Sequence, residues 1–178
     1  MHFTFGKANL SREDNFVGTS YDGYAKNYRG KDYIGIAVDY AYRIGHKTDF
    51  CTGIVVTLNR YDYTYNYDWN ASSSDCSDAL SVFSVPLHLK YHLLKLPVGE
   101  FVIGGGIDAN YHPNNGYSWG IGLNVNAGWE YTLKSGLFFA LSPMMQWNLL
   151  DPLYQKDYAR KSDLLAQTGL NIGGGFKW

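Results

Sequence analysis

Three nitrogen-bearing side chains alternate along one stretch of the chain and could together carry proton or metal chemistry. His88, Lys90 and His92 are two residues apart, so on a β-strand they share one face. Imidazoles relay protons and bind metals, which makes a proton relay or a metal site one interpretation. We favour a polar plug, because buried charges must be paired and hydrogen bonded, and we therefore expect no metal and no cofactor. Further members of this polar set on other predicted strands are Asp39, Arg43, Asp108, Glu130 and Lys177.

Two groups of predicted loop residues contain the types needed for nucleophilic catalysis. One group is His112 with Ser118, and the other is Ser72 to Ser74 with Asp75. Ser and Asp in loops are usually turn formers, so we predict that the protein is not an enzyme. The alternatives to this prediction are an enzyme that modifies lipid at the outer rim of a membrane protein, and a narrow channel through a membrane.

The elements that would position these side chains are β-strands. Residues 117–131 show this best, because every odd position is apolar or aromatic and every even position is small or polar. A period of two predicts a strand with one apolar and one polar face. In the second strand of the series, a change of phase near Asn59-Arg60 suggests a β-bulge. The same alternation predicts strands near 32–45, 50–67, 81–93, 100–111, 137–148 and 167–178, and residues 2–10 supply an eighth.

Eight strands predict an all-β fold, an eight-stranded antiparallel up-and-down transmembrane β-barrel formed by a single domain, 1–178. The predicted connections alternate in length, as this topology requires. The short ones lie near 45–48, 95–99 and 132–136, and the others lie near 11–31, 66–79, 112–116 and 149–163. Short turns belong on the periplasmic side and long loops outside.

The order of side chains along the apolar faces indicates a bilayer. Aromatic residues stand at both ends and aliphatic residues in the middle, and Tyr61 is assigned to the ring at the long-loop end. A soluble, lipocalin-like barrel with its faces reversed is the alternative. It is disfavoured because the polar face is rich in Gly, Ala, Ser and Asn and poor in Lys and Glu. The predicted membrane girdle consists of Tyr40, Tyr42, Tyr91, Trp119, Trp129, Tyr131, Trp147, Phe176 and Trp178.

Composition and charge narrow the location and the partners. The formal net charge is −1 and no basic run occurs, so we expect no nucleic-acid partner. No stretch of 18 consecutive apolar residues occurs, which excludes a transmembrane helix. No signal peptide is visible at Met1, and for an exported protein we expect it to have been removed. Cys51 and Cys76 lie too far apart on the predicted strands for a disulfide.

Several short motifs carry a resemblance to a known family. They are Gly6-Lys7-Ala8-Asn9-Leu10, Val85-Pro86-Leu87-His88-Leu89-Lys90-Tyr91, Gly104-Gly105-Gly106, Gly120-Ile121-Gly122-Leu123-Asn124 and Gly173-Gly174-Gly175-Phe176-Lys177-Trp178. With them the chain resembles the outer membrane protein β-barrel domain family of Bacteroides-type Gram-negative bacteria and, more distantly, small OmpA/OmpX-type barrels. The resemblance implies an integral outer membrane protein with periplasmic termini. It also implies that the barrel assembly machinery reads a terminal aromatic, here Trp178 where Phe is commoner.

The predicted role is structural or interactive. The partners we expect are outer membrane lipid, the assembly machinery during biogenesis, and a protein or glycan that meets the outer loops. Membership of a larger outer membrane complex as an accessory subunit is one form of this role. The candidate loop surface is the aromatic series Tyr63, Tyr65, Tyr67 and Trp69.

Overall fold

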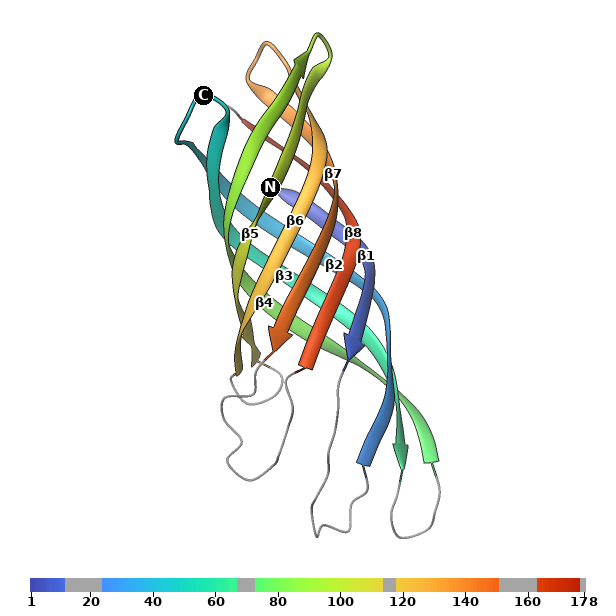
Figure 1. The fold of residues 1–178 in the computed structure, drawn as a ribbon. Helices are drawn as coiled ribbons and strands as arrows, with labels where there is room; N and C mark the ends of the chain where they lie inside the picture. The colour runs from blue at the N-terminus through green and yellow to red at the C-terminus, as the bar shows by residue number, and fades with distance from the viewer. Residues whose placement is uncertain (12–23, 67–72, 114–117, 151–162, 177–178) are drawn as a thin grey trace.

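The computed structural model describes residues 1–11, 24–66, 73–113, 118–150 and 163–176. Each strand pairs antiparallel with its neighbours in sequence, and β1 closes the ring against β8 (Figure 1). This confirms the predicted eight-stranded antiparallel up-and-down barrel. The described ranges contain no helix of the length and apolarity that membrane crossing requires. The strands are β1 (His2–Ser11), β2 (Tyr24–Arg43), β3 (Thr48–Asn66), β4 (Ser73–Leu96), β5 (Gly99–His112), β6 (Ser118–Thr132), β7 (Leu137–Leu150) and β8 (Asp163–Phe176).

Alternation along each strand decides which side chains fill the barrel. In β6, Asn124 and Glu130 point inward and are 6% and 3% exposed, whereas Ile121 on the opposite face is 67% exposed. The first strand, whose phase the sequence leaves open, places Thr4 and Ala8 inside and Phe3 outside. The polar face is therefore the interior and the apolar face is the outer surface.

Close approach of three strands depends on glycine. Gly6 of β1 pairs with Gly169 of β8 and with Tyr33 of β2. A Cβ on Gly6 would lie 2.1 Å from the carbonyl oxygen of Thr168, and one on Gly169 would lie 2.2 Å from the Tyr33 hydroxyl. The Tyr33 ring thus occupies the space that Gly169 leaves open, while Gly6 lets the β1 and β8 backbones approach each other.

One end of the barrel carries the short turns, at 44–47, 97–98 and 133–136 (top of Figure 1). Gly99 and Gly136, beside or within two of them, have φ of 135° and 84°, where a side chain would be strained. The chain begins at this end, since the amino group of Met1 donates to the carbonyl oxygen of Gly174 over 3.1 Å.

Two strands are longer than predicted at the opposite end. β2 begins at Tyr24 instead of residue 32, and β4 begins at Ser73 instead of Ser81. Part of each expected loop, 11–31 and 66–79, is therefore strand. Residues 24–31, 62–66 and 73–77 form a three-stranded extension, here called the lobe, which projects beyond the other strands at the lower right of Figure 1. The long β3 requires these partners because its backbone groups must be hydrogen bonded.

The expected bulge at Asn59-Arg60 is wrong. The β3–β4 register is unchanged from Thr48 opposite Tyr91 to Asn66 opposite Ser73. The irregularities lie in β2, between Lys26 and Arg29 and between Gly30 and Tyr33. β3 therefore keeps its phase, and Tyr61 lies inside the barrel, 8% exposed, instead of in the outward ring.

Candidate functional site: the filled lumen and its outer rim

The lumen contains ion pairs toward the short-turn end. Lys90 Nζ lies 2.6 Å from Glu130 Oε1, and His88 Nε2 lies 2.7 Å from Asp108 Oδ1. The carboxylate side chains are almost completely buried, with 4% of Glu130 and 2% of Asp108 exposed. Strands β4, β5 and β6 supply these four groups, and each buried carboxylate faces a basic side chain, as burial of charge requires.

His92 bridges two carboxylates. Its Nδ1 lies 2.7 Å from Glu100 Oε2 and its Nε2 lies 2.8 Å from Asp49 Oδ2. A carboxylate only accepts hydrogen bonds, so both bonds are satisfied when both ring nitrogens carry a proton. His92 thereby ties β3 to β5 across β4.

Two further ion pairs lie at the mouth beside the short turns. Arg43 Nε lies 2.5 Å from Asp49 Oδ1, and the Arg43 side chain is half exposed. His2 Nδ1 lies 2.6 Å from Asp39 Oδ2. The charged residues therefore continue from the interior to the edge of the barrel at this end.

A chain of side-chain hydrogen bonds crosses the middle of the lumen. Gln146 Nε2 donates to Asp108 Oδ2 over 2.9 Å and to Asn148 Oδ1 over 3.1 Å. Asn148 Nδ2 donates to Gln167 Oε1 over 3.1 Å, and Gln167 Nε2 donates to Asn59 Oδ1 over 2.5 Å. The chain joins β5, β7, β8 and β3, and so connects opposite parts of the barrel wall.

A side branch joins this chain of hydrogen bonds. We call the whole set the amide layer: Asn59, Ser84, Asn110, Gln146, Asn148 and Gln167. Ser84 Oγ donates to Asn110 Oδ1 over 2.6 Å, and Asn110 Nδ2 donates to Asn148 Oδ1 over 2.9 Å. The layer fits because Gly122 has no side chain, since a Cβ there would lie 2.3 Å from Asn148 Oδ1. Asn110 and Asn148 are 0% and 1% exposed, so the layer fills its section of the lumen.

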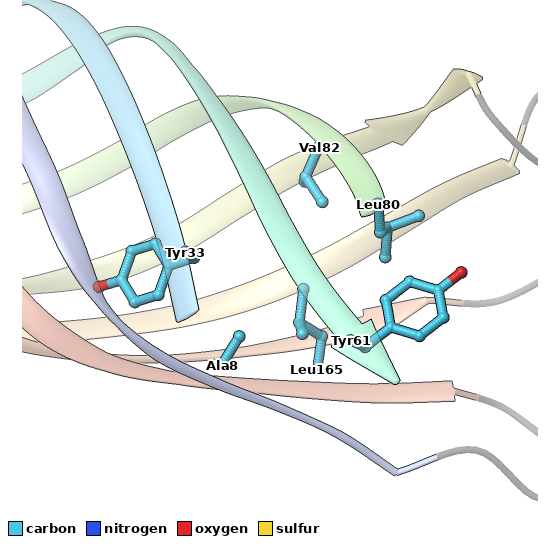
Figure 2. Packing of buried hydrophobic residues seen from close by; sticks show 6 residues of the cluster. All are labelled: Ala8, Tyr33, Tyr61, Leu80, Val82 and Leu165. Atoms are coloured by element: carbon cyan, nitrogen blue, oxygen red, sulfur yellow. The ribbon is translucent and has the colours of Figure 1, made fainter. Parts of the chain in front are cut away.

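Apolar packing follows toward the long-loop end (Figure 2). The Tyr33 and Tyr61 rings pack with small and branched side chains from three other strands, β1, β4 and β8. Tyr63 packs against the cluster and is partly buried. We call the following set the apolar cap: Ala8, Tyr33, Tyr61, Leu80, Val82 and Leu165.

The outer surface is an apolar belt with aromatic side chains near its edges. Toward the short turns, Tyr40, Tyr42 and Phe176 are 57%, 59% and 65% exposed. Toward the long-loop end, aromatic rings form a row across β4, β5 and β6. The Tyr111 ring centroid lies 6.5 Å from that of Phe83 and 5.2 Å from that of Trp119.

The other residues predicted for the girdle and loop surface are placed as follows. Tyr91 and Tyr131 are exposed on the outer face, while Trp129 and Trp147 are half-buried. The backbone of Tyr65 pairs with Ala25 in the lobe. Outside the described residues lie Tyr67, Trp69, Lys177 and Trp178.

Sequence reasoning did not assign the amides of the lumen to a site. Asn59, Asn110, Asn148, Gln146 and Gln167 carry the central network, and each is buried. The alternation along each strand places these side chains inside the barrel. It does not show which of them meet, because that depends on the register between strands. The acidic partners Asp49 and Glu100 were missed for the same reason.

The β5–β6 register brings one of the two catalytic groupings considered above together as neighbouring backbone positions, and Ser72 of the other grouping lies outside the described residues. His112 is buried and stands opposite Ser118 in the β5–β6 register, and Ser73 to Asp75 lie in β4.

Cys51 pairs with His88 and Cys76 with Tyr63, so about 40 Å of strand separates the two thiols. Within the described ranges, no three His, Cys, Asp or Glu side chains meet as a metal site.

No protein-family model matches the chain, and neither does any curated protein sequence. Among solved structures, the chain is similar to the crystal structure of the outer membrane protein OprG from Pseudomonas aeruginosa. The match covers 99% of this chain and 95% of that chain, with 10% sequence identity and a TM-score of 0.46. The chain is an eight-stranded antiparallel barrel with a filled polar lumen and an apolar outer surface.

Proposed function

We propose that this protein is a small integral outer membrane barrel whose lumen is closed to bulk flow and whose lobe and outer connections meet a partner. The observation that carries the proposal is that the barrel has apolar side chains outside and polar side chains inside, the reverse of a soluble barrel. Ile121, Val38 and Ile54 are each more than 60% exposed, while the amides of the lumen are buried. Such a surface is stable only against acyl chains.

The proposal includes an orientation. Short turns lie on the periplasmic side of known barrels of this type, so we place both termini there and the lobe outside. Export would then have removed a signal peptide, and the assembly machinery would read Trp178 during insertion. Membership of the small outer membrane barrel families named above is part of the same proposal.

A structural role is favoured over a channel because three kinds of filling follow one another along the lumen: ion pairs, amides and the apolar cap. Planar-bilayer recording tests this, with an open porin as the positive control. We expect no stable current steps from the protein. Steps of uniform size that persist after repurification would contradict the closed lumen.

A non-catalytic role is favoured because His112, which stands opposite Ser118, is only 1% exposed and points into the lumen instead of toward the lipid. The lipid-modifying alternative is tested by the mass of lipid A from cells expressing the protein. We expect the mass to equal that of cells carrying the empty vector. A new acylated, deacylated or otherwise altered species would support the enzyme instead.

The interaction role is supported by the lobe, which carries hydrogen-bonding side chains beyond the barrel. Ser77 Oγ donates to Asp62 Oδ1 over 2.6 Å, and Thr64 Oγ1 donates to Asp75 Oδ1 over 3.2 Å. A photo-crosslinking residue at Thr64 should capture a discrete partner in native membranes. The same residue at Lys134, in a short turn, serves as the control, and equal adducts at both sites would contradict a role for the lobe. An accessory subunit would copurify with the captured protein.

A further inference from the structure

Basic side chains gather on the outer face of β1, β2 and β3 where the apolar belt ends. Along β3 the exposed Leu58 is followed on the same face by Arg60, and along β1 the exposed Phe5 is followed by Lys7. We call this set the cation arc: Lys7, Arg29, Lys31 and Arg60, with the carboxylates Asp32 and Asp62 among them.

The two carboxylates hold two of the cations in place. Arg60 Nη2 lies 2.9 Å from Asp32 Oδ2, and Lys31 Nζ lies 2.8 Å from Asp62 Oδ2. Strand register places Lys7 directly opposite Asp32 and Arg29 directly opposite Asp62. Each carboxylate therefore stands beside two basic residues on one continuous face.

Positive charge is in excess in the cation arc. Its four basic side chains face two carboxylates, and within the described part of the chain neither Lys7 nor Arg29 forms an ion pair. Hydrogen bonds from Lys31 and then Ser77 hold the pKa of Asp62 below its usual range, so this carboxylate stays ionised at neutral pH. Within the cation arc, the basic side chains therefore exceed the carboxylates by two at neutral pH, and Asp75, farther along the same face, accepts a hydrogen bond from Thr64.

At the long-loop end of the described barrel, the basic side chains of the outer face lie on the β1–β3 side. At the same end of the belt, β4, β5 and β6 present the aromatic row of Phe83, Tyr111 and Trp119 instead. At the opposite end, the exposed cations include Arg43 and Lys95, which face Asp49 and Glu100, and Lys47 and Lys134, which lie in separate turns. On the β1–β3 side, the four cations stand directly beyond the exposed apolar side chains Phe5 and Leu58.

We propose that the cation arc binds the phosphate group of a lipid headgroup in the leaflet at the long-loop end. The inference rests on the proposed membrane location. Arg and Lys bind phosphate by charge-assisted hydrogen bonds, and basic clusters beside a membrane attract anionic lipids. A lipid fits better than a free anion, because its acyl chains would contact Phe5, Ile34 and Leu58 while its phosphate reaches the cations above them.

Native mass spectrometry of the folded protein in detergent tests this. Phosphatidic acid and phosphatidylcholine with identical acyl chains are offered at equal concentration. We expect several-fold more bound phosphatidic acid than phosphatidylcholine. The double variant Lys7→Gln/Arg29→Gln should reduce this preference to near one, and the matched control Lys47→Gln/Lys134→Gln should keep it.

Two further measurements separate the outcomes. Inorganic phosphate equimolar with the lipid should leave the preference intact, and its loss under that condition would show a free-anion site and overturn the lipid assignment. Flotation with pure phosphatidylcholine vesicles tests membrane insertion alone. A protein that floats but shows no preference for phosphatidic acid overturns lipid binding at the cation arc and leaves the proposed function standing. An equal loss of that preference in both double variants does the same. A protein that does not float contradicts the proposed function itself.

Discussion

At the scale of single residues, the lumen depends on exact complementarity between small and polar side chains. Gly122 leaves room for Asn148, and Lys90 faces the buried Glu130. Such sites tolerate little change, because a buried polar group without its partner costs more than the pair contributes.

Substitution of Gly122 tests the packing of the amide layer. A Cβ at Gly122 would lie 2.3 Å from Asn148 Oδ1 and 3.0 Å from Asn110 Nδ2, so Gly122→Ala must displace both. We expect a loss of about 1–3 kcal/mol in the free energy of unfolding, measured by denaturant titration in detergent. Gly45→Ala is the control, since its Cβ would approach nothing closer than 3.8 Å. Equal stability of both variants would contradict the tight fit.

Removal of one charge from the Lys90–Glu130 pair should be worse than removal of both. Lys90→Met leaves the Glu130 carboxylate buried without this cation, and we expect a loss of about 3–5 kcal/mol. The double variant Lys90→Met/Glu130→Gln should recover a large part of that loss. A double-mutant cycle on unfolding free energies measures the coupling, and additive losses would show that the pair does not interact.

At the scale of elements, the lobe shows how one long strand determines its neighbours. β3 keeps a constant register with β4, while β2 contains two irregularities that let it follow β3 beyond the barrel. Side-chain pairs across these strands, including Lys31 with Asp62, then join the lobe together on its outer face.

The lobe should keep the Asp62–Lys31 pair at moderately acidic pH. The folded-state pKa of Asp62 is lowered, chiefly by the hydrogen bond from Lys31. Its contribution to stability is therefore complete above the ordinary Asp pKa and is lost as the pH falls through the lower folded-state value. Carboxyl ¹³C shifts should show Asp62 titrating below an ordinary Asp. Lys31→Gln should move the midpoint upward, and an unchanged midpoint would contradict this cause.

At the scale of the whole molecule, a barrel that is apolar outside and polar inside has three zones: the short-turn end, the apolar belt and the lobe. If the protein spans the outer membrane as proposed, these zones differ in their access to a water-soluble thiol reagent. Single cysteines placed in a Cys51→Ser/Cys76→Ser background report that access.

We expect three labelling patterns in intact cells. Thr64→Cys in the lobe should react, and Ile121→Cys in the belt should remain unlabelled until the protein is denatured. Lys134→Cys in a short turn should react only after the outer membrane is permeabilised. Reaction of Lys134→Cys but not Thr64→Cys in intact cells would reverse the proposed orientation.

The local alternation of side chains was sufficient to predict seven strands, the short turns and the inward polar face, because the face that a residue occupies depends on its own strand's period of two. The eighth strand, at residues 2–10, followed from the even number of strands that such a barrel needs, and its phase stayed open. Tertiary structure alone decided which polar groups meet, such as Gln167 with Asn59, since that depends on register and ring closure. It also decided the phase of Tyr61 and the length of the lobe. There β2 absorbs two extra residues, an adjustment driven by pairing with β3 that no pattern within β2 reveals.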